Sequence, residues 1–204
     1  MENNPTATDI LIYQGIVTRS VNRLDRTIQS LIEIIDLQNQ NQHIVKELTF
    51  ETLFHESLEE YEQFIKESGA KIEMDFSTAP GIAYIEGHLQ SLFHNLLSNS
   101  LKYKDEKRKL KIRVATKTSS KKIILTFSDN GVGMDMEKVK DRLFVPFNRF
   151  SGQVEGKGIG LYLIKSMIES NGGSVAVDSD PGKGTTFTFS LIPYKLTDQE
   201  IAKS

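Results

Sequence analysis

The sequence contains no cysteine and only four histidines among its 204 residues. Without cysteine there is no disulfide framework, no thiolate zinc site and no cysteine nucleophile. The histidines form no HExxH motif, so a histidine metal centre has little material. No apolar run approaches the roughly 20 residues of a membrane-spanning helix, and residues 1–10 lack a signal-peptide profile. We therefore expect a soluble, cytoplasmic protein that makes no membrane contact itself, and we leave open whether a longer parent protein is membrane-anchored.

An excess of one charge is also missing. Lys plus Arg number 25 and Asp plus Glu number 27, which gives a net charge of −2. This near-balance argues against a nucleic-acid binder that relies on bulk positive charge. The hydrophobic fraction of 38% and the charged fraction of 25% are typical of a packed globular protein, and the length suits one domain with a remainder.

The glycines are unevenly distributed along the chain. Ten of the 14 lie between residues 131 and 184, at positions 131, 133, 152, 156, 158, 160, 172, 173, 182 and 184. Glycine is favoured where the backbone needs a positive φ or approaches a ligand closely. This region is therefore either a set of tight turns or a ligand cradle.

An apolar stripe runs through residues 17–35. Its members are four and three residues apart in turn: Val17, Val21, Leu24, Ile28, Leu31 and Ile35. This repeat is typical of the seam of a coiled coil or helix bundle. We expect an intermolecular bundle, because few positions outside the stripe are apolar and no comparable partner helix follows. A single helix packed on its own domain is the alternative.

After a polar stretch at residues 38–42, helical and strand patterns alternate. Apolar steps of three and four residues predict helices at residues 54–65, 86–102 and 158–170, the first of them closed by Gly69. Alternating or short apolar runs predict strands at residues 43–50, 71–76, 110–114, 123–127, 175–177 and 186–191. Strands grouped in antiparallel hairpins, with helices between them, indicate an α+β two-layer sandwich.

Three polar side chains share one side of the predicted 86–102 helix. Asn95 and Asn99 are four residues apart, and Lys102 follows three residues later. Neutral oxygen ligands for the ion and a positive charge for the phosphates suit a magnesium–phosphate group. An ordinary polar outer face explains this segment alone equally well.

Asp129, Gly131 and Gly133 directly follow the predicted strand at residues 123–127. A carboxylate at a strand end, beside glycines that let a ligand approach the backbone, can accept a hydrogen bond from the exocyclic amine of a base. A plain Asn-Gly turn is the alternative and, for this segment alone, the more common case.

Gly156, Gly158 and Gly160 open the predicted 158–170 helix. Exposed backbone amides and the positive helix end make an anion site. The spacing fits neither the Rossmann GxGxxG pattern nor the P-loop pattern, so this motif is weak evidence alone. Residues 182–187 carry a further Gly-Lys-Gly, which alone predicts a hairpin turn.

Together and in this order, these segments resemble the ATP-binding domain of sensor histidine kinases. That family belongs to the wider ATPase superfamily of gyrases, heat-shock chaperones and mismatch-repair proteins. The matching segments are an asparagine box at residues 95–103, then residues 129–133, an aromatic box at 144–147, and residues 156–161 and 182–187. The resemblance covers about residues 47–193 and implies a Bergerat-type ATP-binding fold.

Residues 10–40 resemble the second helix of the dimerisation and phosphotransfer hairpin of the same kinases, including the run Arg23-Leu24-Asp25-Arg26. The resemblance thus implies three parts. They are a partial dimerisation helix at residues 1–42, an ATP-binding catalytic domain at 43–193 and a tail at 194–204.

The resemblance implies ATP and Mg²⁺ as ligands of the asparagine box. Asn99 is expected to ligate Mg²⁺, and Asn95, Lys102 and Tyr103 to contact the phosphates and the ribose. Of these, Asn95, Asn99 and Lys102 are the expected catalytic residues.

The resemblance also assigns the adenine subsite and the lid. Asp129 is expected to take the adenine amine, with Gly131 and Gly133 making room and Thr185 close by. Residues 134–157 are expected to form a mobile lid. The further residues expected at the phosphates or on the lid are Phe144, Phe147, Gly156, Gly158, Ile159, Gly160 and Leu161.

The sequence departs from the family pattern in two ways. Ser100 stands where the family has a small alanine, a change that we expect to be tolerated. The phosphoacceptor signature His-Glu-x-Arg/Lys-x-Pro is absent. His55-Glu56 matches only its first two residues, and we expect His55 to be a surface histidine. We expect the chain to be a fragment, with the acceptor histidine on a helix that it lacks.

The resulting prediction is the catalytic portion of a two-component sensor histidine kinase. It transfers the γ-phosphoryl group of Mg-ATP to a histidine, forms a homodimer through the 17–35 helix and signals to a response-regulator receiver domain. A degenerate module that binds nucleotide or a partner without kinase activity is the first alternative. A gyrase- or chaperone-type ATPase is the second, although those enzymes carry a carboxylate where Asn95 stands.

Overall fold

The computed structural model describes residues 13–18, 20, 21, 28, 44–148 and 158–195. The chain divides into two units, residues 1–41 and residues 42–204. In the first unit all the described residues are helical, and the described members of the apolar stripe, Val17, Val21 and Ile28, are exposed. The other members of the predicted 17–35 stripe lie outside the described residues.

The second unit is built on a five-stranded sheet with the strand order β2-β4-β5-β7-β6. Its strands are β2 (Lys71–Asp75), β4 (Lys111–Ser119), β5 (Lys122–Asp129), β6 (Ser174–Asp180) and β7 (Gly184–Leu191). The predicted antiparallel hairpins are confirmed for β4–β5 and β6–β7. The sequence analysis assigned no partner to β2, which pairs in parallel with β4. This pairing is possible because a long crossover that includes a helix lies between the two strands.

A second, two-stranded sheet flanks the first. It pairs β1 (Val45–Thr49) with β3 (Gly81–Ile85) in antiparallel register. Strand β1 corresponds to the strand predicted at residues 43–50, whereas β3 was not predicted. Four of the five residues of β3 are buried, so the strand lacks the alternation that marks a half-exposed strand.

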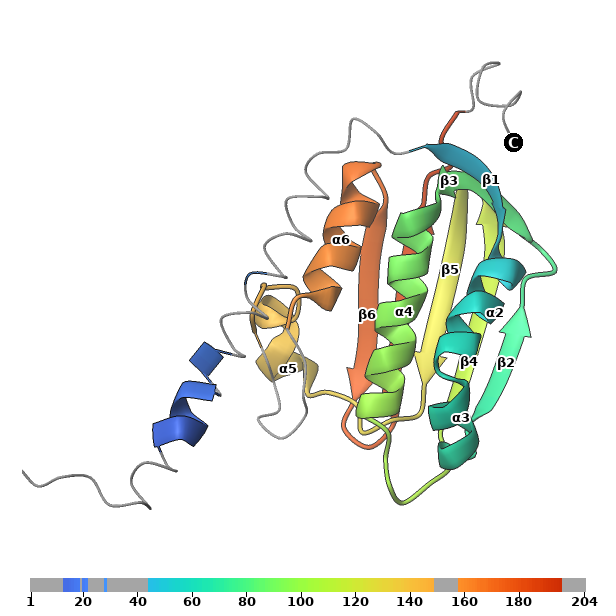
Figure 1. The fold of residues 1–204 in the computed structure, drawn as a ribbon. Helices are drawn as coiled ribbons and strands as arrows, with labels where there is room; N and C mark the ends of the chain where they lie inside the picture. The colour runs from blue at the N-terminus through green and yellow to red at the C-terminus, as the bar shows by residue number, and fades with distance from the viewer. Residues whose placement is uncertain (1–12, 19, 22–27, 29–43, 149–157, 196–204) are drawn as a thin grey trace, which may run out of the picture. The chain divides into compact units, whose positions relative to one another are not determined.

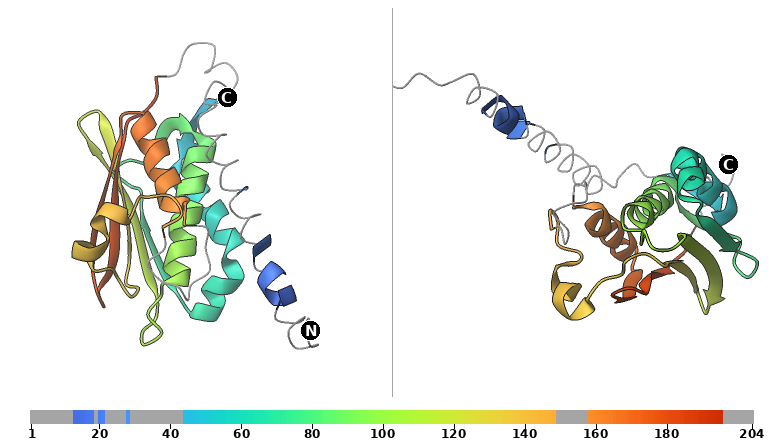
Figure 2. Two further views of the ribbon diagram at one scale, coloured as in Figure 1. Left: turned by 90° about the vertical axis from the view of Figure 1, so that its left-hand side faces the viewer. Right: turned by 90° about the horizontal axis from the view of Figure 1, so that it is seen from below.

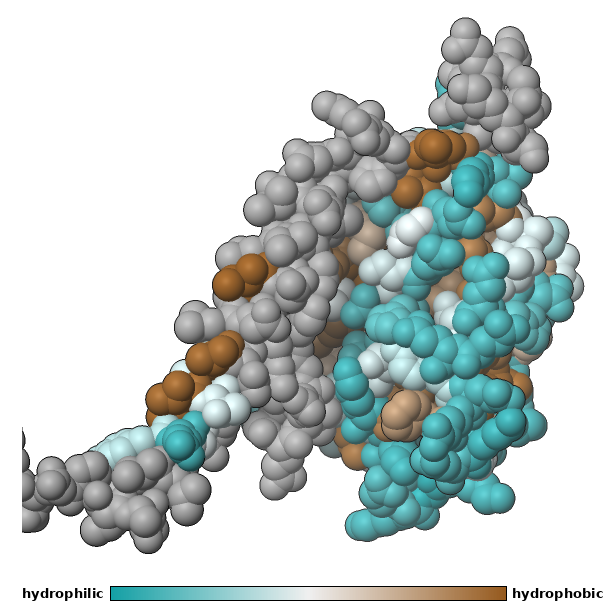
Figure 3. Space-filling view, in the orientation of Figure 1, coloured by the Kyte–Doolittle hydropathy of each residue, from teal (hydrophilic) through white to brown (hydrophobic). Residues whose placement is uncertain are grey.

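Four helices cover one face of the five-stranded sheet (Figures 1 and 2). They are α2 (Phe50–Glu60), α3 (Glu62–Ser68), α4 (Glu86–Lys102) and α6 (Gly160–Ser170). Helix α4 lies between α2 and α6, and the surface over α2 and α3 is mostly hydrophilic (Figure 3). The layers confirm the predicted α+β two-layer sandwich.

The helix boundaries follow local chemistry. Thr49 caps α2 by accepting a hydrogen bond from the Thr52 amide, at 3.4 Å between Oγ1 and N. The predicted 54–65 helix is interrupted at Tyr61, which separates α2 from α3. Gly69 ends α3 in the left-handed conformation, with φ of 60°, as its position in the sequence predicts.

A cluster of aromatic rings joins α2 and α4 to the sheet. Phe54 packs against Phe93 of α4 with ring centroids 5.2 Å apart, and against Phe127 of β5 at 6.4 Å. All three rings are fully or almost fully buried. Burying each such side chain contributes about 2–3 kcal/mol, and each ring pair adds about 1 kcal/mol. The cluster thereby fixes α4 over β5, whose last residue is Asp129.

The segment after β5 contains two short helical pieces, α5 (Met136–Val139) and η2 (Lys140–Arg142). They begin the segment predicted to be a lid, residues 134–157. Residues 149–157 of that segment lie outside the described residues.

Candidate functional site

Helix α4 presents the asparagine box as the sequence predicts. Leu96 and Leu97 are buried in the core, whereas Asn95 and Asn99 are half-buried and Lys102 is exposed. The Asn95 side chain is anchored, because its Nδ2 donates to the carbonyl oxygen of Ser91 at 2.8 Å. Asn99 and Lys102 form no side-chain hydrogen bond or ion pair with any described residue, so both remain available to a ligand.

Asn95 meets the glycine-rich segment at the start of α6. A Cβ atom on Gly160 would overlap Asn95 Oδ1, so only glycine allows this approach. Ile159, the residue before α6, makes no side-chain capping hydrogen bond. Among the described residues, the first-turn amides of α6 therefore have no side-chain cap from Ile159, and such a helix end suits an anion.

Ile159 and Leu161 do not offer their side chains to this site. Ile159 is buried, and Leu161 packs against the hydrophobic core. Any contact that these two residues make with a ligand would use their main-chain groups. Gly158 has a φ of 72°, and Gly156 lies outside the described residues.

Asp129 ends β5 in a partly buried position. Its Oδ1 accepts the Gly131 amide at 2.8 Å, and its Oδ2 accepts the Ser100 hydroxyl at 3.1 Å. The backbone of Thr185, on the paired strand β7, also favours the charged carboxylate. Burial raises the pKa of Asp129, although these hydrogen bonds and the charge of Arg108 act in the opposite direction. The two hydrogen bonds from Gly131 and Ser100 fill about half of the roughly four lone-pair sites of the carboxylate, which leaves room for a further donor.

The loop after Asp129 connects the end of α4 to the β6–β7 turn. The Val132 amide donates to the Tyr103 carbonyl at 2.9 Å, and the Gly182 amide donates to the Val132 carbonyl at 2.7 Å. Gly133 has a φ of 68°, and a Cβ there would overlap the Asp180 carbonyl. The loop therefore holds the end of α4, the end of β5 and the β6–β7 turn together.

Thr185 lies beside Asp129 in the sheet. The two residues are paired across β5 and β7. The buried Thr185 hydroxyl lies 3.0 Å from Ser179 Oγ, which itself donates to the Gly184 carbonyl at 2.8 Å. Since that bond uses the one hydroxyl proton of Ser179, the Thr185 hydroxyl is the donor in the other bond.

Two residues that hold this loop were missed by the sequence analysis. Arg108 donates from Nε to the Asn130 carbonyl and from Nη2 to the Gly131 carbonyl, each at 2.8 Å. The Asn130 side chain joins the loop to β4, since its Oδ1 accepts the Lys111 amide at 2.7 Å. No sequence signal separates Arg108 from its basic neighbours, and Asn130 has the pattern of an ordinary turn residue.

The two phenylalanines of the aromatic box, residues 144–147, have different surroundings. Phe144 is half-buried, with the Lys165 ammonium 5.0 Å from its ring centroid. Phe147 is exposed and has a positive φ of 63°. No hydrogen bond or ring contact among the described residues joins Phe147 to Asn95, Asn99 or Asp129.

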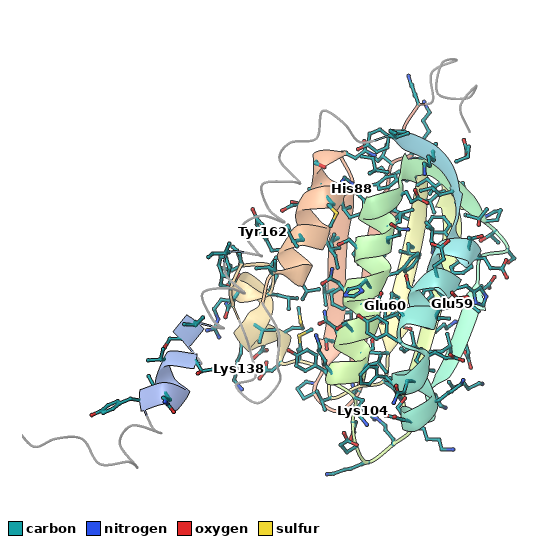
Figure 4. The ribbon with its side chains drawn as sticks, in the orientation of Figure 1. Glu59, Glu60, His88, Lys104, Lys138 and Tyr162 are labelled. Atoms are coloured by element: carbon teal, nitrogen blue, oxygen red, sulfur yellow. The ribbon has the colours of Figure 1, made fainter. Side chains whose placement is uncertain are left out.

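The described histidines occupy different surroundings. His55 is exposed on α2, which confirms the expected surface position. His94 is exposed too, and its Nδ1 lies 3.0 Å from the Glu60 carboxylate on α2. His88 is buried, toward the opposite end of α4 from Lys104 (Figure 4), and so away from the end where the loop after Asp129 attaches. None of these three histidines is paired with Asp129.

Neither a membrane helix nor an acidic metal cluster occurs in the described part of the chain. Its helices are too short or too polar to cross a bilayer. Its His, Asp and Glu side chains also form no group of three that could hold a metal ion. A metal at this site would therefore depend on neutral ligands such as Asn99 together with oxygens of the bound ligand.

Comparisons with known proteins agree with the geometry. Residues 85–195 match the model of the family described as histidine kinase-, DNA gyrase B-, and HSP90-like ATPase. The phytochrome-like protein Cph1 of Synechocystis sp. is 33% identical over 150 residues, which make up 71% of this chain and 20% of Cph1. The histidine protein kinase SaeS of Staphylococcus aureus is 28% identical over 193 residues, or 93% of this chain and 53% of SaeS. The chain thus spans between a fifth and about half of these relatives.

The fold is also found among solved structures. Full-length ShkA, solved in complex with AMPPNP, matches with a TM-score of 0.71 and 18% sequence identity. The match covers 96% of this chain and 41% of that chain. At this level of identity the likeness shows a shared fold.

Proposed function

Because the chain belongs to the family of histidine kinase-, DNA gyrase B- and HSP90-like ATPases, we propose that it binds Mg-ATP and transfers the γ-phosphoryl group to a histidine side chain. ATP binding follows from the family, and the named relative SaeS is a histidine protein kinase. The observation that carries the proposal is the Asp129 carboxylate, which accepts hydrogen bonds from the Gly131 amide and the Ser100 hydroxyl and keeps free acceptor sites.

Asp129 recognises the base in this proposal. Its ionised carboxylate accepts a hydrogen bond from the 6-amino group of adenine at one of its free acceptor sites. Gly131 allows the loop to pack closely here, because a Cβ would approach the Tyr103 carbonyl oxygen to 2.5 Å and Asp129 Oδ1 to 2.9 Å. Guanine presents a carbonyl oxygen at the same position and would face the carboxylate with like charge. The site is therefore selective for adenine.

The polar side of α4 and the start of α6 hold the phosphates. Asn99 offers a neutral oxygen to Mg²⁺, and Lys102 supplies positive charge. Asn95, Tyr103 and the amides that follow Gly158 contribute further hydrogen bonds. Bound Mg²⁺ neutralises phosphate charge, and the protein contributes mainly by positioning the groups.

In the proposed reaction the acceptor is an imidazole nitrogen. The nitrogen lone pair attacks the γ-phosphorus, the bond to the bridging oxygen breaks and ADP leaves. None of the four histidines lies in the phosphoacceptor motif, so the acceptor comes from outside these 204 residues. We propose that the chain forms a homodimer through the 17–35 helix and that a response-regulator receiver domain takes up the phosphoryl group.

The nature of residue 95 favours phosphotransfer over hydrolysis. A gyrase- or chaperone-type ATPase carries a carboxylate base at this place, whereas Asn95 has an amide whose Nδ2 is bound to Ser91. An amide cannot remove a proton from an attacking water. We therefore expect only slow free ATP hydrolysis.

Calorimetric titration with ADP and Mg²⁺ tests the proposal. Asp129→Asn replaces the acceptor oxygen facing adenine with an amide group. We expect a 10- to 100-fold loss of affinity, from about 1.5–3 kcal/mol for a hydrogen bond to a charged group. Asp178→Asn is the matched control, since Asp178 is an exposed carboxylate on strand β6, which β7 separates from β5, and should not affect binding.

Two results would contradict the proposal. A wild-type chain that gives no heat with MgADP would remove nucleotide binding altogether. Equal affinities of the wild type and Asp129→Asn would remove Asp129 from the adenine subsite.

A further inference from the structure

Ser100 makes a contact that its position in the asparagine box does not suggest. It lies on α4, directly after Asn99, and its side chain is only 2% exposed. Its hydroxyl donates to Oδ2 of Asp129, at 3.1 Å, across 29 positions of sequence. The family resemblance places a small alanine here, which has no hydroxyl to donate.

Other helical serines of this chain use their hydroxyls differently. Ser57 donates to the Leu53 carbonyl at 2.9 Å, and Ser170 donates to the Met167 carbonyl at 2.9 Å. Such bonds to the preceding turn are the usual choice of a serine inside a helix. Ser100 instead donates to a residue on another element, so its hydroxyl connects α4 to the end of β5.

We propose that Ser100 is a positioning residue for adenine recognition, which orients the Asp129 carboxylate so that a free acceptor site faces the 6-amino group. The inference rests on the proposed function, because it concerns the same base. Ser100 touches Asp129 and acts through it.

The geometry explains how the orientation is set. Gly131 holds Oδ1 from the loop side and Ser100 holds Oδ2 from the helix side, so rotation of the carboxylate would break at least one bond. Burial disfavours the charged form of Asp129. The Ser100 hydrogen bond and the positive charge of Arg108 both favour it. An alanine would leave Oδ2 without a side-chain donor and its orientation less defined.

The test compares the binding of two ligands to the protein with and without the Ser100 hydroxyl. MgADP and the purine riboside diphosphate that lacks only the 6-amino group are titrated by calorimetry into the wild type and Ser100→Ala. We expect Ser100→Ala to weaken ADP about 3- to 10-fold, as for one hydrogen bond, and to leave the analogue within about twofold. Ser57→Ala is the control, since it removes a buried helical hydroxyl that does not touch Asp129.

Ser100→Cys provides a second variant of similar size with a weak donor, and its ADP affinity should lie between those of the wild type and Ser100→Ala. Equal ADP affinity of the wild type and Ser100→Ala would overturn the inference. An equal loss for both ligands would overturn it too, because that pattern indicates a general structural effect. Failure of the wild type to bind ADP would instead overturn the proposed function itself.

Discussion

Asp129 faces two opposing demands. Its partial burial favours the neutral acid and raises its pKa, whereas base recognition needs the ionised carboxylate. The Gly131 amide, the Thr185 backbone and the Ser100 hydroxyl partly offset this conflict. Such a conflict between burial and charge is typical of functional positions.

The raised pKa predicts how nucleotide affinity depends on pH. Adenine selects the ionised form, so affinity should fall on acidification at a pH above the ordinary Asp value of 3.8. At a pH near the raised pKa of Asp129, nucleotide binding should also release protons. Calorimetry in buffers of different ionisation enthalpy detects this release. Asp129→Asn has no carboxyl to titrate and should lack both effects. A wild-type affinity with the same pH dependence as Asp129→Asn would contradict this.

Folding stability should respond with the opposite sign. A carboxyl whose pKa is raised in the folded state favours folding below its ordinary pKa, and this contribution is lost as pH rises through the folded value. At neutral pH ionised Asp129 therefore lowers the free energy of unfolding. The position serves binding rather than stability.

At the scale of single residues, sequence patterns identify the motif residues better than the residues that hold them in place by hydrogen bonds. Asp129 and Gly131 are recognisable because they lie two residues apart at the end of a strand. Arg108 and Ser100 contact this loop from 23 and 29 positions away, respectively. Only the fold brings such residues together, so no local pattern reveals them.

At the scale of elements, periodicity was most informative for amphipathic helices. Helix α4 spans Glu86–Lys102, the same bounds that the apolar spacing predicts. The buried strand β3 and the parallel β2–β4 pair were not predicted. Strand pairing depends on contacts far apart in the chain, and a short, fully buried strand has no alternating pattern.

The contact between α4 and α6 gives a prediction at this scale. In Gly160→Ala the new methyl group would overlap Asn95 Oδ1, so either the Asn95 side chain gives up its hydrogen bond to Ser91 or the start of α6 moves away from α4. We expect a loss of about 1–3 kcal/mol in the free energy of unfolding, measured by urea denaturation, and weaker MgADP binding. Gly87→Ala on α4 is the control, since a Cβ there meets no atom within 4 Å. Unchanged stability and affinity in Gly160→Ala would contradict the proposed packing role.

At the scale of the whole molecule, the two units have separate proposed tasks. The unit of residues 42–204 contains every described residue of the proposed nucleotide site. The unit of residues 1–41 contains the apolar stripe, of which Val17, Val21 and Ile28 are described and exposed. Dimerisation and nucleotide binding should therefore be separable by mutation.

Ile28→Glu tests this separation. A charge in the proposed helical seam should weaken dimerisation roughly 100-fold, because it replaces a buried apolar contact of about 2–3 kcal/mol, and sedimentation velocity measures the change. MgADP affinity should stay the same. Dimers of unchanged stability in Ile28→Glu would contradict a seam through this position.

The central claim is that the Asp129 carboxylate binds the adenine amine while Asn99 faces the metal-bound phosphates. A crystal structure of the chain with ADP and Mg²⁺ tests it most directly. The account predicts the 6-amino nitrogen within about 3.2 Å of an Asp129 oxygen, with Mg²⁺ on the Asn99 side chain. A nucleotide bound elsewhere, or an adenine whose amine makes no contact with Asp129, would contradict it.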